Sequence, residues 1–232
     1  MRLQAHRYVE LESSPLHVTV PERIEAGSWE AVFRGDTRVA VDGAVGDDNP
    51  SERVPLSLEI GIGKDRHIIE QAAAHPDQRF IGLEYSRKKL DKVLSKALAR
   101  GVDNLRLMRA DAVRILEPLF EERSLDTAYI FFPDPWPKKR HRKKRIVQSE
   151  FIRLLSTRLT DEGRLELRTD DPDYIEQMVE VLEREPTLEN EEGPGKILLD
   201  PRSPETHIPT LFESKFRVEG RQIHYLYYRK RS

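Results

Sequence analysis

The sequence contains no cysteine among its 232 residues. That absence excludes disulfide bonds, a thiolate nucleophile and zinc held by cysteine. The sequence also lacks any apolar run near the ~20 residues that a membrane-spanning helix needs. Its first residues lead into mixed polar sequence and do not resemble a secretion signal. We therefore expect a cytoplasmic protein that does not associate with membranes.

The sequence also has little net charge, because 39 basic and 41 acidic residues give a net charge of −2. The average gives no indication of nucleic-acid binding, but the distribution does. Residues 138–145 read Lys-Lys-Arg-His-Arg-Lys-Lys-Arg without interruption. A run of this kind is often only a solvated surface, yet such a block can also supply the cations that bind nucleic-acid phosphates.

From Pro55 onward, strand-like and helix-like segments alternate. Strands are predicted at 56–60, 79–84, 105–109, 124–132 and 164–168, and helices at 65–74, 86–100, 112–120, 146–159 and 174–185. Regular alternation of this kind predicts an α/β fold, in which crossover helices cover both faces of a mostly parallel sheet.

Two segments fall outside this alternation. Residues 222–229 are rich in β-formers and have no helix after them, so they are predicted to form an antiparallel strand at the sheet edge. Residues 1–54 are poorly patterned. We therefore expect an N-terminal leader of uncertain role at 1–54 and one principal domain at 55–232.

A glycine-containing loop follows the first predicted strand. Gly61 and Gly63 would let the backbone approach a ligand closely, at the carboxyl end of the sheet where open α/β folds bind ligands. Asp65 stands where a third glycine is often found. An acidic side chain there would repel a pyrophosphate, which favours a cationic cofactor over a dinucleotide.

Three carboxylates accompany this loop at the ends of successive strands. Glu59 and Glu84 end the first and second strands, and Asp111 follows the third. A carboxylate after the second strand can accept hydrogen bonds from ribose hydroxyls, and one after the third can orient an adenine amine. Any one of them could be an ordinary polar residue, but together they predict one adenosine-sized site.

The fourth predicted strand leads into Phe131-Phe132-Pro133-Asp134-Pro135-Trp136-Pro137-Lys138. The prolines restrict the backbone and leave a stiff loop at the end of a central strand. Such a loop can present a carboxylate, an aromatic face and a cation together. The alternative is a structural proline turn, which the adjoining basic block makes less attractive.

These motifs resemble those of the tRNA (guanine-N7)-methyltransferases, which modify guanine 46 of tRNA. The matching segments are Glu59-Ile60-Gly61-x-Gly63, Phe80-Ile81-Gly82-Leu83-Glu84, Asn104-Leu105-Arg106, Asp111-Ala112, Phe132-Pro133-Asp134-Pro135-Trp136-Pro137-Lys138, Arg140-His141-x-Lys143-x-Arg145, Thr169-Asp170 and Thr210-Leu211-Phe212-Glu213. The resemblance implies a class I S-adenosylmethionine-dependent methyltransferase fold, Rossmann-like with seven strands. It also implies S-adenosylmethionine as cofactor and tRNA as substrate.

The resemblance further implies roles for individual residues. The expected cofactor-binding residues are Glu59, Gly61, Gly63, Glu84, Asp111 and Asp134. Asp134 is also the expected catalytic residue. The expected substrate-binding residues, with the remaining basic block added, are Lys138, Arg140, His141, Arg142, Lys143, Lys144, Arg145, Asp170, Thr210, Leu211, Phe212 and Glu213. No metal and no obligatory protein partner is expected, and the chain would be a monomer or a homodimer.

Three other functions fit parts of the pattern. A methyltransferase of the same fold could act on an exocyclic amine of a nucleobase in RNA, because a proline-flanked aspartate can also bind such an amine. An NAD-dependent oxidoreductase is disfavoured by Asp65 and by the basic block. A catalytically silent RNA-binding subunit is disfavoured because every expected cofactor carboxylate is present.

Overall fold

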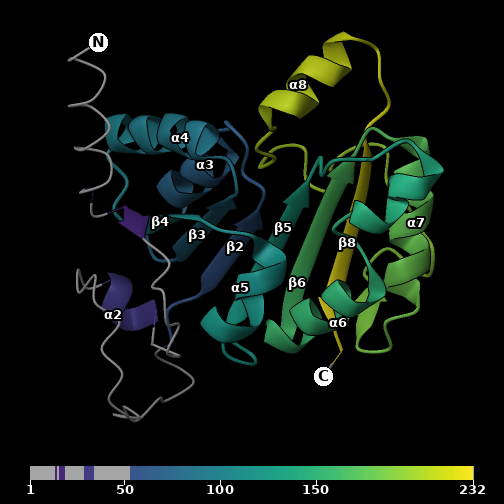
Figure 1. The fold of residues 1–232 in the computed structure, drawn as a ribbon, viewed down its shortest axis with the longest axis horizontal. Coiled ribbons are helices and arrows are strands. Elements are labelled where there is room, and N and C mark those ends of the chain that lie inside the picture. The colour runs from purple at the N-terminus through teal and green to yellow at the C-terminus, as the bar shows by residue number, and fades with distance from the viewer. Residues whose placement is uncertain (1–13, 15, 19–28, 34–52, 232) are drawn as a thin grey trace.

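A computed structural model describes residues 14, 16–18, 29–33 and 53–231 (Figure 1). Eight strands within this part of the chain form one sheet, in the order β1-β4-β3-β2-β5-β6-β8-β7. The strands are β1 (His17–Val18), β2 (Leu56–Ile60), β3 (Arg79–Glu84), β4 (Leu105–Arg109), β5 (Leu125–Phe131), β6 (Leu159–Thr169), β7 (Leu188–Asn190) and β8 (His224–Lys230). The helices are α2 (Trp29–Phe33), α3 (His67–Ala74), α4 (Arg87–Arg100), α5 (Ala112–Leu119), the 3₁₀ helix η1 (Lys139–Lys144), α6 (Ser149–Arg158), α7 (Pro172–Glu183) and α8 (Leu211–Val218).

The sheet confirms the predicted fold class. Neighbouring strands from β1 to β6 pair in parallel, and β8 pairs antiparallel with β6. Two details differ from the prediction. The described sheet has eight strands rather than seven, with β1 of the leader at one edge, and β8 does not lie at the other edge because β7 pairs antiparallel with its outer side. With only three residues, β7 is too short for its pattern to be recognised in the sequence.

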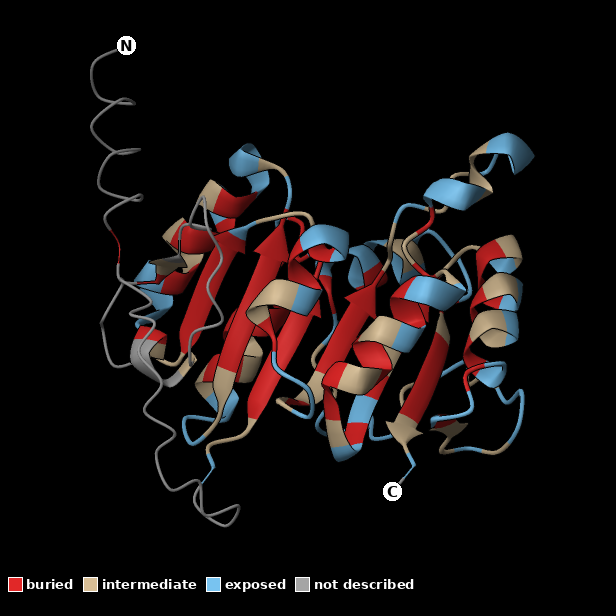
Figure 2. Cartoon of the chain, turned by 60° about the horizontal axis from the view of Figure 1, so that its bottom comes forward, coloured by how far each residue is buried: buried red, intermediate tan, exposed pale blue. Residues whose placement is uncertain are grey.

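Helices cover both faces of the sheet, so its central strands are buried (Figure 2). All five residues of β2 are buried, which is typical of a parallel strand with helices on both sides. Phe80 of β3 packs in a core with α3 and α4, whereas its neighbours Ile81 and Leu83 pack in the core with α5, α6 and α7. This alternation is the period-two pattern of a strand.

A third apolar cluster lies around the start of β8. Ile223, Tyr225 and Tyr227 pack there with Phe132 and Phe216. Phe216 belongs to α8, which lies beyond the carboxyl ends of β5 and β6 (Figure 1). Contacts in this cluster therefore hold α8 over the carboxyl ends of the strands, where open α/β sheets bind ligands.

Several element boundaries differ by a few residues from those predicted. Helix α6 begins at Ser149 rather than at residue 146, and the amide of Val147 donates a hydrogen bond of 3.2 Å to the hydroxyl of Tyr174 instead of joining the helix. Strand β6 begins at Leu159 rather than at residue 164, and its register with β5 shifts between Leu125 and Thr127.

The described residues of the leader pack on the main domain. Strand β1 pairs with β4, and Trp29 Nε1 donates a hydrogen bond of 2.8 Å to the carbonyl of Leu119. The guanidinium of Arg106 donates to the carbonyls of Val32 and Phe33. These contacts attach both described parts of the leader to the sheet, while the rest of the leader lies outside the described residues. None of the helices described combines the length and the apolarity that crossing a membrane demands.

Candidate active site at the carboxyl ends of the central strands

A cavity of about 760 Å³ opens at the carboxyl ends of β2, β3, β4 and β5. Its size falls within the range of small-molecule sites in proteins. The structure brings all six expected cofactor-binding residues to its wall: Glu59, Gly61, Gly63, Glu84, Asp111 and Asp134. These residues come from four segments of the chain that meet only in the folded sheet. The cavity is therefore the candidate active site.

The glycine loop forms a cradle in this wall. Gly61 and Gly63 have φ of +79° and +62°, in the left-handed region that side chains disfavour. A Cβ built on Gly61 would meet no atom within 4 Å, so the space above the loop is open. A ligand can thus approach the backbone here, as the sequence predicted.

Glu84 holds the far side of the same loop. Its Oε2 accepts a hydrogen bond of 2.8 Å from the amide of Gly63, and its Oε1 accepts one of 2.7 Å from the amide of Ser86. Each carboxylate oxygen has a second lone pair available for a ligand hydroxyl. Asp111 is less buried and caps α5, with Oδ1 accepting from the amide of Val113 at 3.1 Å.

Glu59 is the most deeply buried of these carboxylates, with 3% of its surface exposed. Its Oε2 lies 2.8 Å from Nδ1 of His67, a fully buried side chain on α3. The His67 ring packs edge-on against Phe131 at 4.8 Å between centroids. One oxygen of Glu59 is thus engaged within the protein, and the side chain links β2 to α3 below the cavity.

The proline-rich loop supplies the opposite wall. Phe132 and Trp136, which flank the Pro133-Asp134-Pro135 segment, have φ of +48° and +43°. Two non-glycine residues in the left-handed region indicate local backbone strain, which often occurs at functional sites. Asp134 is exposed, and no hydrogen bond to it is found among the described residues. Its carboxylate is therefore available to a bound molecule.

Arg145 holds this strained loop in place. Its guanidinium is fully buried and donates to the carbonyl of Pro135 at 2.6 Å, to Oε1 of Gln177 at 2.8 Å and to Oδ2 of Asp173 at 2.5 Å. It also lies over the ring of Tyr174, 4.5 Å from the centroid. Arg145 was predicted to bind substrate, but these contacts show that it anchors the loop.

The other residues of the basic block are more accessible. Arg142 pairs with Asp173, which shares its two oxygens between Arg142 and Arg145. These two contacts lower the pKa of Asp173, with the hydrogen bond from Arg145 as the largest cause. His141 packs edge-on against Trp136, and Lys144 Nζ lies 4.7 Å from the centroid of the same ring.

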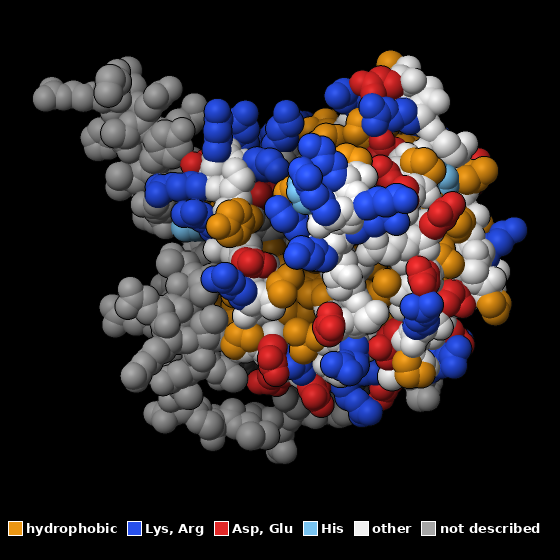
Figure 3. Space-filling model, turned by 45° about the vertical axis from the view of Figure 1, so that its right-hand side comes forward, with side chains coloured by type: hydrophobic (Ala, Val, Ile, Leu, Met, Phe, Trp, Pro, Cys, Tyr) orange, Lys and Arg blue, Asp and Glu red, His pale blue; other side chains and the backbone are white. Residues whose placement is uncertain are grey.

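Only part of the block reaches the cavity itself. Lys143, Lys144 and Arg145 line it, whereas the exposed Lys138 and Arg140 and the half-buried His141 and Arg142 lie outside its wall. Lys and Arg side chains gather over the upper part of the face drawn in Figure 3. Lys89, Lys143, Lys144 and Arg145 thus bring positive charge to a cavity whose wall also carries six carboxylates.

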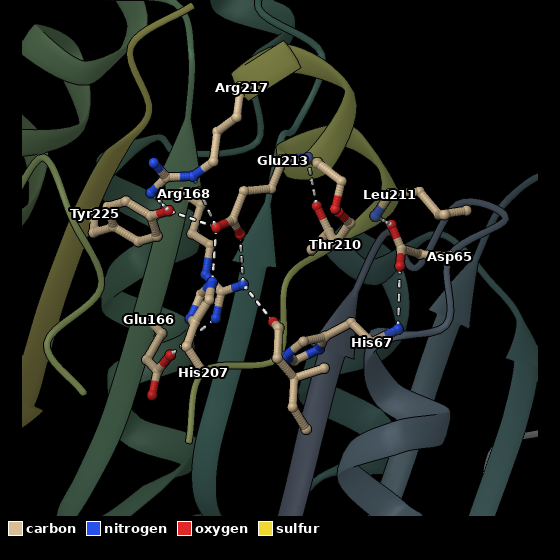
Figure 4. Close-up of polar contacts among 12 residues, drawn as sticks. Asp65, His67, Glu166, Arg168, His207, Thr210, Leu211, Glu213, Arg217 and Tyr225 are labelled. Carbon is tan, nitrogen blue, oxygen red and sulfur yellow. Dashed lines mark hydrogen bonds and ion pairs between the residues drawn. The ribbon is translucent and has the colours of Figure 1, made fainter. Parts of the chain in front are cut away.

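The segment 210–213 begins α8, and its members serve different purposes. Thr210 caps the helix by accepting from the amide of Glu213 at 2.9 Å. Thr210 and Phe212 line the cavity, while Leu211 is exposed and does not. Glu213 is 1% exposed and points away into a polar cluster (Figure 4).

Four side chains surround the Glu213 carboxylate. His207 Nε2 lies at 2.7 Å, the Tyr225 hydroxyl donates at 2.6 Å and Arg168 Nη1 donates at 3.2 Å, with Arg217 Nε at 3.5 Å (Figure 4). Burial alone would raise the pKa of Glu213, but the hydrogen bonds from His207 and Tyr225 and the charge of Arg168 lower it to about 2. Glu213 was predicted to bind substrate, yet it does not line the cavity, and its contacts with Arg168 and Tyr225 hold α8 to β6 and β8.

Asp170, the remaining expected substrate residue, follows β6. Its Oδ2 accepts a hydrogen bond of 2.6 Å from Arg221, and it does not line the cavity. This ion pair links the end of β6 to the segment before β8. No cluster of metal-binding side chains occurs among the residues that the structure describes.

A second group of cations, which was not predicted, lies beside the site. A depression of about 370 Å³ shares Gly63, Lys89 and Phe212 with the main cavity. Lys64, Lys88 and Lys92 complete its cationic lining. The spacing of Lys88, Lys92 and Lys96 at every fourth residue was visible in the sequence and places them on one face of α4.

Comparison with solved structures supports the fold. The chain superposes on the 16S rRNA methyltransferase KamB with a TM-score of 0.58 and 14% identity, covering 93% of this chain and 99% of that one. It superposes on TrmN from Thermus thermophilus with a TM-score of 0.54 and 17% identity, covering 78% of this chain and 46% of that one. At these identities the likeness concerns the fold alone, which is that of class I S-adenosylmethionine-dependent methyltransferases.

Comparison of sequences is more specific. A family model described as "Putative methyltransferase" matches residues 53–226. The tRNA (guanine-N(7)-)-methyltransferase of Alkalilimnicola ehrlichii is 42% identical over 77% of this chain and 74% of that protein. The protein of the same name from Chromohalobacter salexigens is 43% identical over 76% of this chain and 71% of that protein. The chain therefore belongs to the tRNA (guanine-N7)-methyltransferase family.

Proposed function

We propose that this chain transfers a methyl group from S-adenosylmethionine to N7 of guanine at position 46 of tRNA. The observation that carries the proposal is the shared cavity, in which three strand-end carboxylates and the glycine loop face the proline-rich loop with Asp134. An adenosine-containing cofactor and a purine would thus lie side by side. Sequence relatives that bear the name of this activity support the same conclusion.

The residues present fit the cofactor. Glu84 and Asp111 can accept hydrogen bonds from ribose hydroxyls and an adenine amine, and Gly61 and Gly63 leave room for the chain that carries the sulfonium. When bound, S-adenosylmethionine supplies an electrophilic methyl group on a positively charged sulfur. The carboxylates on this wall suit that positive charge better than they would suit a pyrophosphate.

Methyl transfer to guanine N7 depends on how the two reactants are positioned more than on acid–base catalysis. Guanine N7 already carries a free lone pair at neutral pH, so no general base is needed to create the nucleophile. Positive charge moves onto the purine during transfer. Asp134, without a partner among the described residues and held between two prolines, can accept hydrogen bonds from guanine and stabilise that charge.

Cations around the cavity would hold the tRNA. Lys143 and Lys144 line the wall next to Asp134, and Lys88, Lys89 and Lys92 extend the positive surface along α4. Contacts of this type neutralise phosphates and fix the register of the RNA without reading its sequence. We further propose that residues 55–232 are the methyltransferase domain, with residues 1–54 as an extension of it, and that the protein acts in the cytoplasm without an obligatory protein partner.

The test uses unmodified tRNA transcripts and labelled S-adenosylmethionine, followed by identification of the methylated nucleoside. We expect 7-methylguanosine at position 46 and no transfer to a transcript with adenosine at that position. A transcript with 7-deazaguanosine at position 46 sharpens the test, because it lacks N7 but keeps the exocyclic amine. Transfer to that transcript would support the exocyclic-amine alternative, and absence of all transfer and of cofactor binding would favour a silent RNA-binding subunit.

A further inference from the structure

Asp65 departs from the third glycine often found in this loop, and the structure gives it a clear set of partners. Its carboxylate is buried, with 7% of the residue exposed. Oδ1 accepts hydrogen bonds from the amides of Arg66 at 2.6 Å and His67 at 3.1 Å, at the start of α3. Oδ2 accepts one of 2.7 Å from the amide of Leu211 (Figure 4).

The hydrogen bond from Leu211 to Asp65 joins α8 to the loop that contains Gly61 and Gly63. Leu211 is the first residue of α8 and lies 146 positions after Asp65 in the sequence. The first amides of a helix have no partner within the helix, and an ionised carboxylate at that end is favourable. A single side chain therefore satisfies backbone donors of both α3 and α8, and a glycine could not do so.

The position of α8 decides the shape of the cavity. Phe212, the next residue, lines the cavity and the lysine-lined depression beside it. The Phe212 ring lies 6.2 Å from the ring of Phe132, the strained residue that begins the Asp134 loop. On its other side, α8 is held by the Glu213 cluster. Asp65 thus holds the side of the first turn that faces the cofactor loop.

We propose that Asp65 is a positioning residue that fixes the first turn of α8 over the cavity and so couples the cofactor loop to the substrate side. The proposal rests on the function proposed above, in which the two sides bind S-adenosylmethionine and tRNA. Without the bond, the first turn of α8 opens more often and Phe212 spends less time in the cavity wall. The apparent Kd then rises in inverse proportion to the fraction of molecules that are in the binding-competent state.

Leu211→Pro tests the bond with little risk to the helix. Proline has no amide hydrogen, and it is favoured at the first position of a helix. Thr210, the residue before it, has φ −79° and ψ 164°, which a following proline permits. The reference is Leu211→Ala, which loses the same side chain but keeps the amide. Relative to that reference, we expect the Kd for S-adenosylmethionine, measured by calorimetry, to rise about tenfold, as loss of a charge-assisted hydrogen bond predicts.

Two further readouts separate positioning from a general loss of stability. The KM for tRNA should rise by a similar factor while kcat at saturation changes by less than about twofold, because the Asp134 loop itself is intact. Amide hydrogen exchange across residues 212–216 should become faster, whereas exchange in α6 and α7 stays unchanged.

A double-mutant cycle decides whether the two residues act through this one contact. Asp65→Ala should weaken cofactor binding at least as much as Leu211→Pro does relative to Leu211→Ala. In the Asp65→Ala background, Leu211→Pro and Leu211→Ala should then bind the cofactor equally well. Independent, additive effects would overturn the proposal, as would a Leu211→Pro variant that behaves like Leu211→Ala. In that case Asp65 serves α3 only. Cofactor binding and hydrogen exchange test the contact even if the wild-type protein left guanine N7 unmethylated, so the two proposals can fail separately.

Discussion

The two walls of the cavity are built in different ways. On the proposed cofactor side, Glu59, Glu84 and Asp111 each stand at the end of a strand and line the cavity. On the proposed substrate side, Arg145 is fully engaged by protein partners, and Glu213 lies outside the cavity wall and bonds to other parts of the protein. Residues that carry a family motif can therefore either face the ligand or hold the residues that do. Burial alone does not separate the two roles, because Glu59 and Glu84 are also buried; what separates them is whether the side chain lines the cavity with a group left for a ligand.

The largest effect is expected at the substrate-side residue that has no protein partner. Asp134→Asn keeps the shape of the side chain but removes its charge, so we expect single-turnover methyl transfer at saturating cofactor to slow by about 10²-fold or more. Stability should change little because Asp134 is exposed. Asp161→Asn, at an exposed aspartate outside the cavity, is the control. Methyl transfer by Asp134→Asn at the wild-type rate would show that the Asp134 carboxylate has no catalytic role.

Glu213 should show the opposite behaviour, a large effect on stability. Its pKa of about 2 in the folded protein lies below the usual 4.5, so the ionised form stabilises the fold. The sign follows from linkage: this contribution is fully present above pH 4.5, is lost as the pH falls towards 2, and amounts to about 3 kcal/mol. The free energy of unfolding, measured by denaturant titration across this interval, should fall accordingly.

Glu213→Gln provides the comparison for that titration. It replaces the carboxylate with an amide among Arg168, His207, Arg217 and Tyr225, so the variant should be less stable at neutral pH and lose the acid-dependent decline that Glu213 contributes. A variant with the stability and pH profile of the wild type would show that the cluster contributes little. The cofactor affinity of the folded variant then tells whether the position of α8 depends on it.

The contrast between the walls also explains what the sequence could and could not predict. The five central strands, and the meeting of Glu59, Glu84 and Asp111 at one cavity, follow from local pattern and from the rule that parallel strands end at one edge. Arg145 bonds to Pro135 and Asp173, 10 and 28 positions away, and Glu213 bonds to Arg168, 45 positions away. No local sequence pattern indicates partners at such separations. Helix α8 buries only Glu213, so it lacks the apolar stripe that made α3 and α5, of the same length, recognisable. Strand β7 has only three residues, too few to show an alternation.

Asp65 has a structural role that its sequence context does not indicate. Its charge favours a cationic cofactor over a pyrophosphate, in agreement with the S-adenosylmethionine dependence of the family, but that is only part of the explanation. The structure shows both carboxylate oxygens engaged by backbone amides of α3 and α8. An acidic residue in a glycine loop thus has a structural explanation that only the distant Leu211 reveals.

A moderate effect is expected on the cofactor side. Glu84→Ala should raise the Kd for S-adenosylmethionine about tenfold, because one charged hydrogen-bond acceptor is lost. Glu84→Gln keeps one acceptor oxygen for the amide of Gly63 and should lose less. Asp77→Ala, at an exposed aspartate before the opposite end of β3, is the control for calorimetry. Unchanged affinity in a folded Glu84→Ala protein would remove Glu84 from the site.

The smallest effect is expected at one exposed member of the basic block, and it separates the two roles within that block. Lys143 lines the cavity with no hydrogen bond or ion pair found for it among the described residues, whereas Arg145 anchors Pro135. Lys143→Ala should therefore leave stability and cofactor affinity unchanged, weaken tRNA binding only several-fold and reduce the slope of log K against log salt by about one. Lys196→Ala, at an exposed lysine outside the cavity, should change none of these quantities. If Lys143→Ala kept the full salt slope, the basic block would be a solvated surface, and its one essential member would be the buried Arg145. The cations along α4 would then be the better candidates for binding the phosphates.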